Sequence, residues 1–350
     1  MSIPAGLGGI SDMRRKLKIL LVFDCPYTVA RGYDFKEEFK DFNWATERGV
    51  YNALKESGHK VTMLGIHDNI NVLLEEIKEN RPELIFNLVE VFNSQSRLEK
   101  NMAALIEMLD IPYTGSSLGA LFICNNKAIC KERLTYHKIK VPHFYTYYRG
   151  HKVWLPKKLN LPLIVKPLTE EASRGISQAS IVDSEDALIE RVRFIHENMN
   201  MDAIAEEYID GREFYVSMIG NKRIRVLPLR EVKFGQFPED EPRIATYKAK
   251  WDDDYRKRWG IKNVFAGRLP EGWDKKIAET CKRAYRALNM CSYARFDIRV
   301  TPQAQVYIIE ANANPNLDRD DEVGQSAEKA GISYPELIQK IVSLAFQRRE

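Results

Sequence analysis

The chain has 350 residues, of which 44% are hydrophobic and 29% charged, and its formal net charge at pH 7 is +4. These values are ordinary for a globular protein that can bury a large core and hold two or three domains. The mild charge gives no support for a nucleic-acid partner, apolar runs are too short for a membrane span, and five scattered cysteines without a CxxC pair favour reduced cytoplasmic thiols over a zinc site.

Alternating strands and helices are expected from residue 17 onward, after a flexible tail over residues 1–16. The predicted strands are Leu17–Phe23, Lys60–Ile66 and Leu84–Val89, and the predicted helices are Asn43–Ser57, Ile70–Ile77 and Leu98–Leu109. This order implies a parallel sheet with helices on its faces, in a Rossmann-like domain over residues 17–122. Such sheets bind ligands at the carboxyl ends of their strands.

Beyond residue 122, the predicted strands and helices no longer alternate one by one. Residues 123–210 have predicted helices at Lys127–His137 and Ser184–Asn198, and strands at Pro142–Tyr148, Leu163–Lys166, Ile176–Val182 and Ala203–Ile209. Residues 211–350 are strand-rich, with a hairpin turn at Gly220-Asn221, a long polar loop over Asp240–Gly260, a helix through Ile277–Leu288, and a last helix that begins with Ser333 and Glu336 at capping-box spacing.

The most informative pattern is a predicted hairpin near the C-terminus. Arg295 and Asp297 alternate on its first strand, and Glu310 and Asn312 alternate on its second, so each pair faces one side of a sheet. A turn centred between residues 303 and 304 would place Asp297 opposite Glu310 and Arg295 opposite Asn312. Carboxylate and amide oxygens suit Mg²⁺, and a guanidinium suits a phosphate or an oxyanion. The alternative is a solvated hairpin with ordinary surface charges, which the apolar residues between these positions disfavour.

Other motifs precede the hairpin in a fixed order. They are Pro112–Ser116, Lys127, Lys166-Pro167 with Ala172–Ile176, Glu206–Phe214, and Lys250. Taken together, the ordered set resembles the ATP-grasp superfamily and, within it, the D-alanine–D-alanine ligase group, over about residues 82–345. The resemblance implies a mixed α/β and α+β fold: an N-terminal Rossmann-like parallel-sheet domain, a central small α+β domain over residues 123–210 and a C-terminal α+β domain over residues 211–350, with ATP between the last two.

The resemblance implies a nucleotide site with distinct parts. Lys127 and Lys166 would contact the phosphates of ATP, and the loop Thr169–Gly175, with Ser173, would cover them through backbone N–H groups. The remaining contacts would be Glu206, Glu207, Tyr208 and Ile209 around adenine at the edge of a strand, Glu213 at the ribose hydroxyls, and Lys250 at the transferring phosphoryl group. Taken singly, the lysines could be surface residues, Glu206 and Glu207 an exposed edge, and Tyr208 and Ile209 plain core.

The resemblance also implies the metal and catalytic groups. Asp297, Glu310 and Asn312 would hold two Mg²⁺ ions, with Glu310 bridging them and Mn²⁺ as an alternative metal. Arg295 would stabilise the oxyanion of a tetrahedral intermediate, together with the backbone N–H near Asn316.

The chain departs from D-alanine–D-alanine ligases where those enzymes hold their substrates. The segment Val89–Ser94, which includes Glu90, replaces a His- and Gly-rich segment, and Trp251 replaces a tyrosine. The early acidic residue that meets the amine of the first substrate has no convincing match over Phe39–Ala45.

The acceptor end of the site differs as well. Asp321 stands at the position of a short hydroxyl that receives the carboxylate of the acceptor, and two carboxylates repel each other. We therefore hypothesise an acceptor that is cationic or larger than a D-amino acid, such as an amino sugar, a polyamine or a peptide terminus. The alternative is that Asp320 or Asp321 caps a helix that begins near Glu322.

The function implied is that of an ATP-dependent carboxylate–amine ligase. A carboxylate would take the γ-phosphoryl group to form an acyl phosphate, and an amine would then form an amide or peptide bond, with release of ADP and phosphate. The expected partners are small-molecule or peptide carboxylates and amines, with no nucleic acid or membrane. A homodimer is one alternative for the oligomeric state. The alternatives are a D-alanine–D-alanine ligase proper, a small-molecule kinase with the same ATP site, and a non-enzymatic nucleotide-binding regulator.

Overall fold

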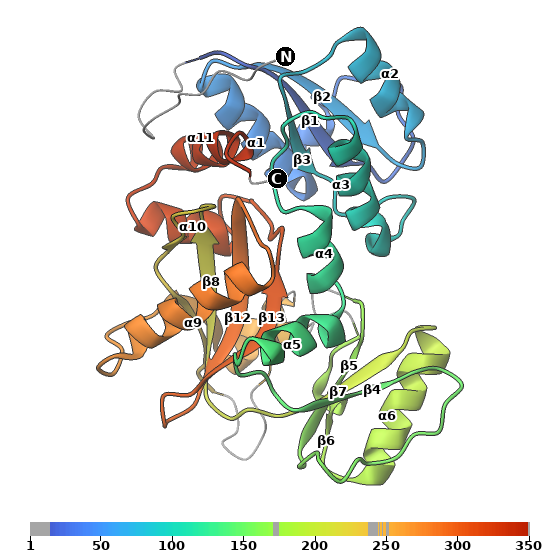
Figure 1. Ribbon diagram of the computed structural model, residues 1–350, viewed down its shortest axis with the longest axis vertical. Coiled ribbons are helices and arrows are strands. Elements are labelled where there is room, and N and C mark those ends of the chain that lie inside the picture. Colours follow the sequence, from blue (N-terminus) through green and yellow to red (C-terminus); the bar gives the residue numbers. More distant parts are fainter. Residues whose placement is uncertain are drawn as a thin grey trace.

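The computed structural model of the protein describes residues 15–170, 175–236, 244, 246, 248–249 and 252–348. Within these ranges the chain forms three β-sheets with helices packed on them, and Figure 1 shows them as three successive layers along the long axis. None of the helices in the described ranges has the length and apolar character needed to cross a membrane. Nearly all of the predicted tail lies outside the described residues.

The N-terminal layer is the predicted parallel sheet. Its strands, in the spatial order β2-β1-β3, are β2 (Lys60–Ile66), β1 (Lys18–Asp24) and β3 (Leu84–Leu88), and all pairs are parallel. The helices of this layer are α1 (Ala45–Glu56), α2 (Asn71–Glu79) and α3 (Glu99–Met108). Alternate residues of β1 pack into two separate apolar clusters, so helices cover both faces. The sequence did not predict that the last helix, α11 (Tyr334–Ala345), packs beside α1 on this same layer.

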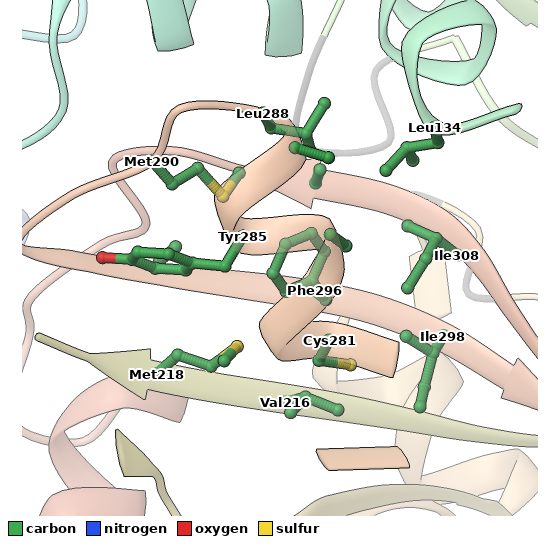
Figure 2. Close-up of a cluster of buried hydrophobic side chains, with 14 of the residues drawn as sticks. Leu134, Val216, Met218, Cys281, Tyr285, Leu288, Met290, Phe296, Ile298 and Ile308 are labelled. Carbon is green, nitrogen blue, oxygen red and sulfur yellow. The ribbon is translucent and has the colours of Figure 1, made fainter. Parts of the chain in front are cut away.

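The largest sheet is antiparallel and lies in the C-terminal half. Its strands are β8 (Arg212–Ile219), β9 (Arg225–Val226), β10 (Arg230–Phe234), β11 (Ile261–Phe265), β12 (Tyr293–Val300) and β13 (Val306–Asn312), in the spatial order β11-β10-β8-β12-β13 with β9 beside β8. The helix α9 (Trp273–Ala287) covers one face. Figure 2 shows Cys281 and Tyr285 of this helix over Phe296 and Ile298 of β12. Because the apolar residues of β12 and β13 are buried under α9, the residues that alternate with them lie on the opposite face of the sheet.

The third sheet lies in the middle of the chain and is also antiparallel. Its order is β4 (Phe144–Tyr147), β7 (Ala203–Glu207), β5 (Leu163–Pro167) and β6 (Ile181–Val182), and α6 (Glu185–Asn198) packs on one face. The helix α5 (Lys127–Tyr136) lies between this sheet and the large one (Figure 1). A short helix that the sequence did not predict, α4 (Leu118–Cys124), precedes α5. The domain boundaries near residues 122 and 210 stay predictions.

Two segments differ from their predicted structure, and a third agrees with a predicted alternative. The predicted strand Ile176–Val182 is reduced to two residues because a 3₁₀ turn over Gln178–Ser180 precedes it. The predicted loop Asp240–Gly260 contains the helix α8 (Asp253–Trp259), whose N-cap Asp252 accepts a hydrogen bond from the Tyr255 N–H. The helix α10 (Glu322–Lys329) begins after Asp321, as the capping alternative predicted.

Candidate functional site

The hairpin of β12 and β13 has the predicted pairing at its polar end. Asp297 lies opposite Glu310 and Arg295 opposite Asn312. Nearer the turn, however, Ile298 lies opposite Ile308, so the pairing shifts by one residue across a bulge at Ile309. The bulge lets both strands keep their apolar residues in the core while their polar residues share the other face.

Asp297 is the centre of the polar patch. The Nε of Arg295 donates to its Oδ1 at 2.8 Å and the Nη2 to its Oδ2 at 3.3 Å, while the Nδ2 of Asn312 donates to Oδ1 at 3.3 Å. Burial would lower the pKa of Arg295, but the charge of Asp297, the hydrogen bond to it and the charges of Asp321 and Tyr215 together outweigh burial and raise it. Arg295 is therefore a permanent cation, and two of its N–H groups hold the carboxylate of Asp297.

The oxygens of Asp297, Glu310 and Asn312 fit a Mg²⁺ ion that is shared with phosphate. The strand register puts the two carboxylates side by side, and a half-turn of the Asn312 amide would present its oxygen. Within the part of the chain that the structure describes, no three His, Cys, Asp or Glu side chains gather to hold a metal. Asp297, Glu310 and Asn312 would supply part of an octahedral shell, and Mg²⁺ sites of that kind are completed by water and phosphate oxygens.

A chain of buried ion pairs lies next to this patch. Lys166 of β5 donates to Glu206 Oε2 of β7 at 3.0 Å, and Lys127 of α5 lies 3.8 Å from Glu310 Oε1 and donates to the Glu170 carbonyl. Lys166 and Lys127 are 7% and 9% exposed. Lys127 therefore lies directly beside the polar patch, while Lys166 is linked to the hairpin through Glu206 and Lys131.

Lys131 is a member of this chain that the sequence analysis missed. Its Nζ lies 3.4 Å from Glu206 Oε1 and donates to the Ile309 carbonyl at 2.8 Å, so it ties α5 to the bulge of β13. Burial lowers the pKa of Lys131. Burial would raise the pKa of Glu206, but Lys131 and Lys166 outweigh it and hold that pKa below its ordinary value. Lys131 follows Lys127 by four residues on one helix, which was the available sequence signal.

The predicted adenine segment is only partly as expected. The strand β7 is flanked by β4 and β5, so it has no free edge, and the prediction of a strand edge was wrong. The Glu207 N–H donates to the His143 carbonyl, and its carboxylate accepts two hydrogen bonds from Asn160. The Tyr208 N–H donates to the Pro162 carbonyl. Glu206 is held by lysines, and beyond β7 the Ile209 carbonyl accepts from Arg299 Nη1 at 2.9 Å, so the adenine contacts of this segment stay predictions.

Three of the remaining predicted residues have hydrogen bonds that the structure describes. The Asn316 Oδ1 accepts hydrogen bonds from Thr46 of α1 and from the Asp318 N–H, each at 2.8 Å. The backbone N–H of Glu90 donates to Asp24 at the carboxyl end of β1. Asp321 is the N-cap of α10 and accepts from the Glu322 N–H at 2.7 Å. Ser173, Lys250 and Trp251 lie outside the described residues, as does most of the predicted phosphate loop.

Glu47, in the first turn of α1, is an acid that the sequence analysis did not single out. It follows Thr46, which bonds to Asn316, and its Oε2 is buried without a hydrogen-bond partner. Burial raises the pKa of Glu47 to about 7, and the charges of Asp24 and Asp318 add to the effect. Glu47 is therefore protonated in the folded protein at pH values below about 7, well above the range in which a free glutamate ionises.

We expect Glu47→Gln to stabilise the protein above pH 7. The unfolded chain ionises this group near pH 4.5 and the folded chain only near pH 7, so the wild type loses stability as the pH rises through that window. Glutamine does not ionise, so the variant does not lose stability at this position as the pH rises. The gain in free energy of unfolding should be about 1–2 kcal/mol at pH 8, after allowance for partial exposure, and should vanish at pH 4.5. Denaturant unfolding at both pH values measures it, and an equal difference at both would contradict the assignment.

Comparisons with known proteins give a consistent result. Residues 139–343 match the family model described as D-ala D-ala ligase C-terminus. The chain is 29% identical over 304 residues to the uncharacterized protein y4sG of Sinorhizobium fredii, covering 85% of this chain and 87% of that protein. It is 26% identical over 317 residues to the D-alanine–D-alanine ligase of Pelotomaculum thermopropionicum, covering 88% and 93%. Its fold is similar to that of the Bacillus anthracis D-alanine–D-alanine ligase complexed with ATP, with a TM-score of 0.71 and 20% identity over 94% of this chain and 98% of that one.

Proposed function

This chain belongs to the D-ala D-ala ligase C-terminus family and is an ATP-dependent carbon–nitrogen ligase of the ATP-grasp fold, and from this premise we propose that it joins a carboxylate to an amine through an acyl phosphate. The resemblance predicted from the ordered motifs is confirmed at the level of the family and the fold. The carboxylate donor, the amine acceptor and the intermediate belong to the proposal.

One observation carries the proposal: buried cations from three elements lie beside, or one ion pair away from, the oxygen ligands of the hairpin. Lys127 of α5 lies beside Glu310, Lys166 of β5 is held by Glu206, and Arg295 is held by Asp297. A nucleotide polyphosphate needs such cations in a partly dry site. If Lys166 binds a phosphate of ATP, Lys131 would still neutralise Glu206. This would account for the second buried lysine at Glu206.

The reaction would proceed in two displacements. In the first, a carboxylate oxygen forms a bond to the γ-phosphorus, the bond from that phosphorus to the β,γ-bridging oxygen breaks, and ADP leaves. In the second, an amine nitrogen bonds to the acyl carbon, the carbon–oxygen bond to phosphate breaks, and the nitrogen loses a proton. Lys127 and Lys166 would position the phosphates, and Arg295 would stabilise the oxyanion of the second step. A bound Mg²⁺ would offset phosphate charge at Asp297, Glu310 and Asn312.

A substrate screen tests the proposal. The full chain would be incubated with ATP, Mg²⁺ and pairs drawn from amino acids, short peptides and amines, with phosphate release as the first readout and mass spectrometry of products as the second. D-alanine alone is the first arm, because relatives named D-alanine–D-alanine ligase support it. An amide product would support the proposed ligase activity. A stable phosphorylated product without an amide would instead show that the protein acts as a small-molecule kinase.

We expect Asp321→Ser to change the preference for the acceptor without loss of stability. Serine caps helices about as well as aspartate, so α10 should keep its N-terminus, while the negative charge disappears. If the acceptor is cationic, its KM should rise about tenfold, and acceptors with a carboxylate should gain by comparison. Asp321→Ala is the control, since it removes both cap and charge. Unchanged acceptor preference in Asp321→Ser would leave capping as the whole role of Asp321.

A further inference from the structure

A third charged residue follows Arg295 and Asp297 on the same face of β12. This residue is Arg299, which the strand register places between Glu213 of β8 and Tyr307 of β13. Two residues of strand, about 7 Å, separate it from Asp297. On this face, the proposed metal and phosphate residues lie near the polar end of the hairpin. The pair of Glu213 and Arg299 lies beside them, closer to the turn of the hairpin.

The guanidinium of Arg299 contacts three groups of the predicted nucleotide site. Its Nε and Nη2 donate to Glu213 Oε2 at 3.2 Å and 2.7 Å, and its Nη1 donates to the Ile209 carbonyl at 2.9 Å. Its centre lies 4.9 Å from the centroid of the Tyr208 ring. The side chains of Arg299 and Glu213 are 5% and 12% exposed. Arg299 therefore joins the strand that carries Glu213 to the segment that follows β7.

We propose that Arg299 is the positioning residue of the ribose contact, which holds Glu213 ready to accept hydrogen bonds from the ribose hydroxyls. The inference rests on the proposed function, because Glu213 meets ribose only if ATP lies against this face of the sheet. Without Arg299, Glu213 would be a nearly buried carboxylate that lacks its cation, and it would turn away or take up a proton. Arg299 would thus set both the affinity for ATP and the preference for ribose over deoxyribose.

A second Arg–Glu pair on the same sheet separates this role from general support of the fold. Arg212 donates from Nε and Nη2 to the two oxygens of Glu231, each at 2.8 Å. Arg212 precedes Glu213 on β8, so it faces the other side of the sheet, where it contacts the ring of Trp273 in α9. Its pair is also an Arg–Glu ion pair, but it lies on the face away from Glu213, Arg212 is more exposed than Arg299, and Lys233 also donates to Glu231.

Binding measurements on the full chain test the inference. Titration calorimetry with Mg²⁺ present would give the Kd of ATP and of its 2′-deoxy and 3′-deoxy analogues for the wild type, Arg299→Met, Arg299→Lys and Arg212→Met. Arg299→Met should weaken ATP binding about 10- to 100-fold and the binding of at least one deoxy analogue much less, so that discrimination against that analogue collapses. Arg299→Lys should fall between, because lysine cannot hold the carboxylate and the carbonyl with one planar fork. Arg212→Met should keep the wild-type preference.

The outcomes separate the inference from the proposed function. A wild type that does not bind ATP would overturn the proposed function and the inference with it. A wild type that binds ATP, beside an Arg299→Met variant with the same affinity and discrimination, would overturn the inference alone, as would an equal loss in Arg212→Met. If Arg299→Met does not fold, Arg299→Lys decides: lost discrimination supports the role, and retained discrimination refutes it.

Discussion

Glu310→Gln should lower the turnover number at least about 100-fold, a loss of a few kcal/mol of transition-state stabilisation. Glutamine preserves the shape of the side chain but removes the charge that lies opposite Asp297 and 3.8 Å from Lys127. If the carboxylate holds a metal with the nucleotide, turnover of the variant should also continue to rise with Mg²⁺ concentration after the wild type has saturated. Steady-state phosphate release across a Mg²⁺ series measures both effects.

The control for this variant is Glu279→Gln on the exposed side of α9, which should keep wild-type turnover. Thermal unfolding would show whether each variant is folded. Near-normal turnover in Glu310→Gln would remove the assignment of this hairpin to the metal.

Arg295→Lys should lower the turnover number about 100- to 1,000-fold while the KM for ATP changes only a few-fold. Lysine keeps the positive charge but cannot hold Asp297 with two parallel N–H groups and still present a donor to an oxyanion. The nucleotide contacts proposed for Lys127 and Lys166 come from other elements, so binding of ATP should survive. Initial rates with the substrate pair found by the screen, over a range of ATP concentrations, separate the two parameters.

Arg286→Lys on the exposed surface of α9 is the matched control, because the same chemical change there should leave turnover unaltered. A turnover within about threefold of wild type for Arg295→Lys would assign Arg295 to the support of Asp297 alone. A loss confined to the KM for ATP would instead assign it to the nucleotide.

The sequence was most informative where periodicity and packing agree. The apolar runs at Leu17–Phe23 and Lys60–Ile66 belong to β1 and β2, and the capping box at Ser333 and Glu336 begins α11 as expected. The helix α8 was hidden in a polar segment, because its apolar side is only Tyr255 and Trp259, and its end signals, Asp252 at the N-cap and Gly260 at the C-cap, are also typical of a loop. The packing of α11 on the first layer was beyond reach, since no local pattern fixes which of several apolar faces meet.

The candidate site was predictable where alternation on adjoining strands determined it. The pairing of Asp297 with Glu310 followed from a period of two, and the same period carried one step farther reaches Arg299, which we did not single out. Lys131 was overlooked because a helical lysine is usually a solvated one, and only the fold shows that it is buried against Glu206. The functional roles of these residues stay predictions.

The position of α11 has a consequence for how the molecule is made. The apolar cluster that covers one face of β1 combines Leu21 and Phe23 of that strand with Leu337, Ile338 and Ile341 of α11, which come from the far end of the chain. Loop closure over that distance delays folding, and vectorial synthesis forbids it until those late residues have left the ribosome. The layer that holds β1 therefore cannot close until α11 has been synthesised.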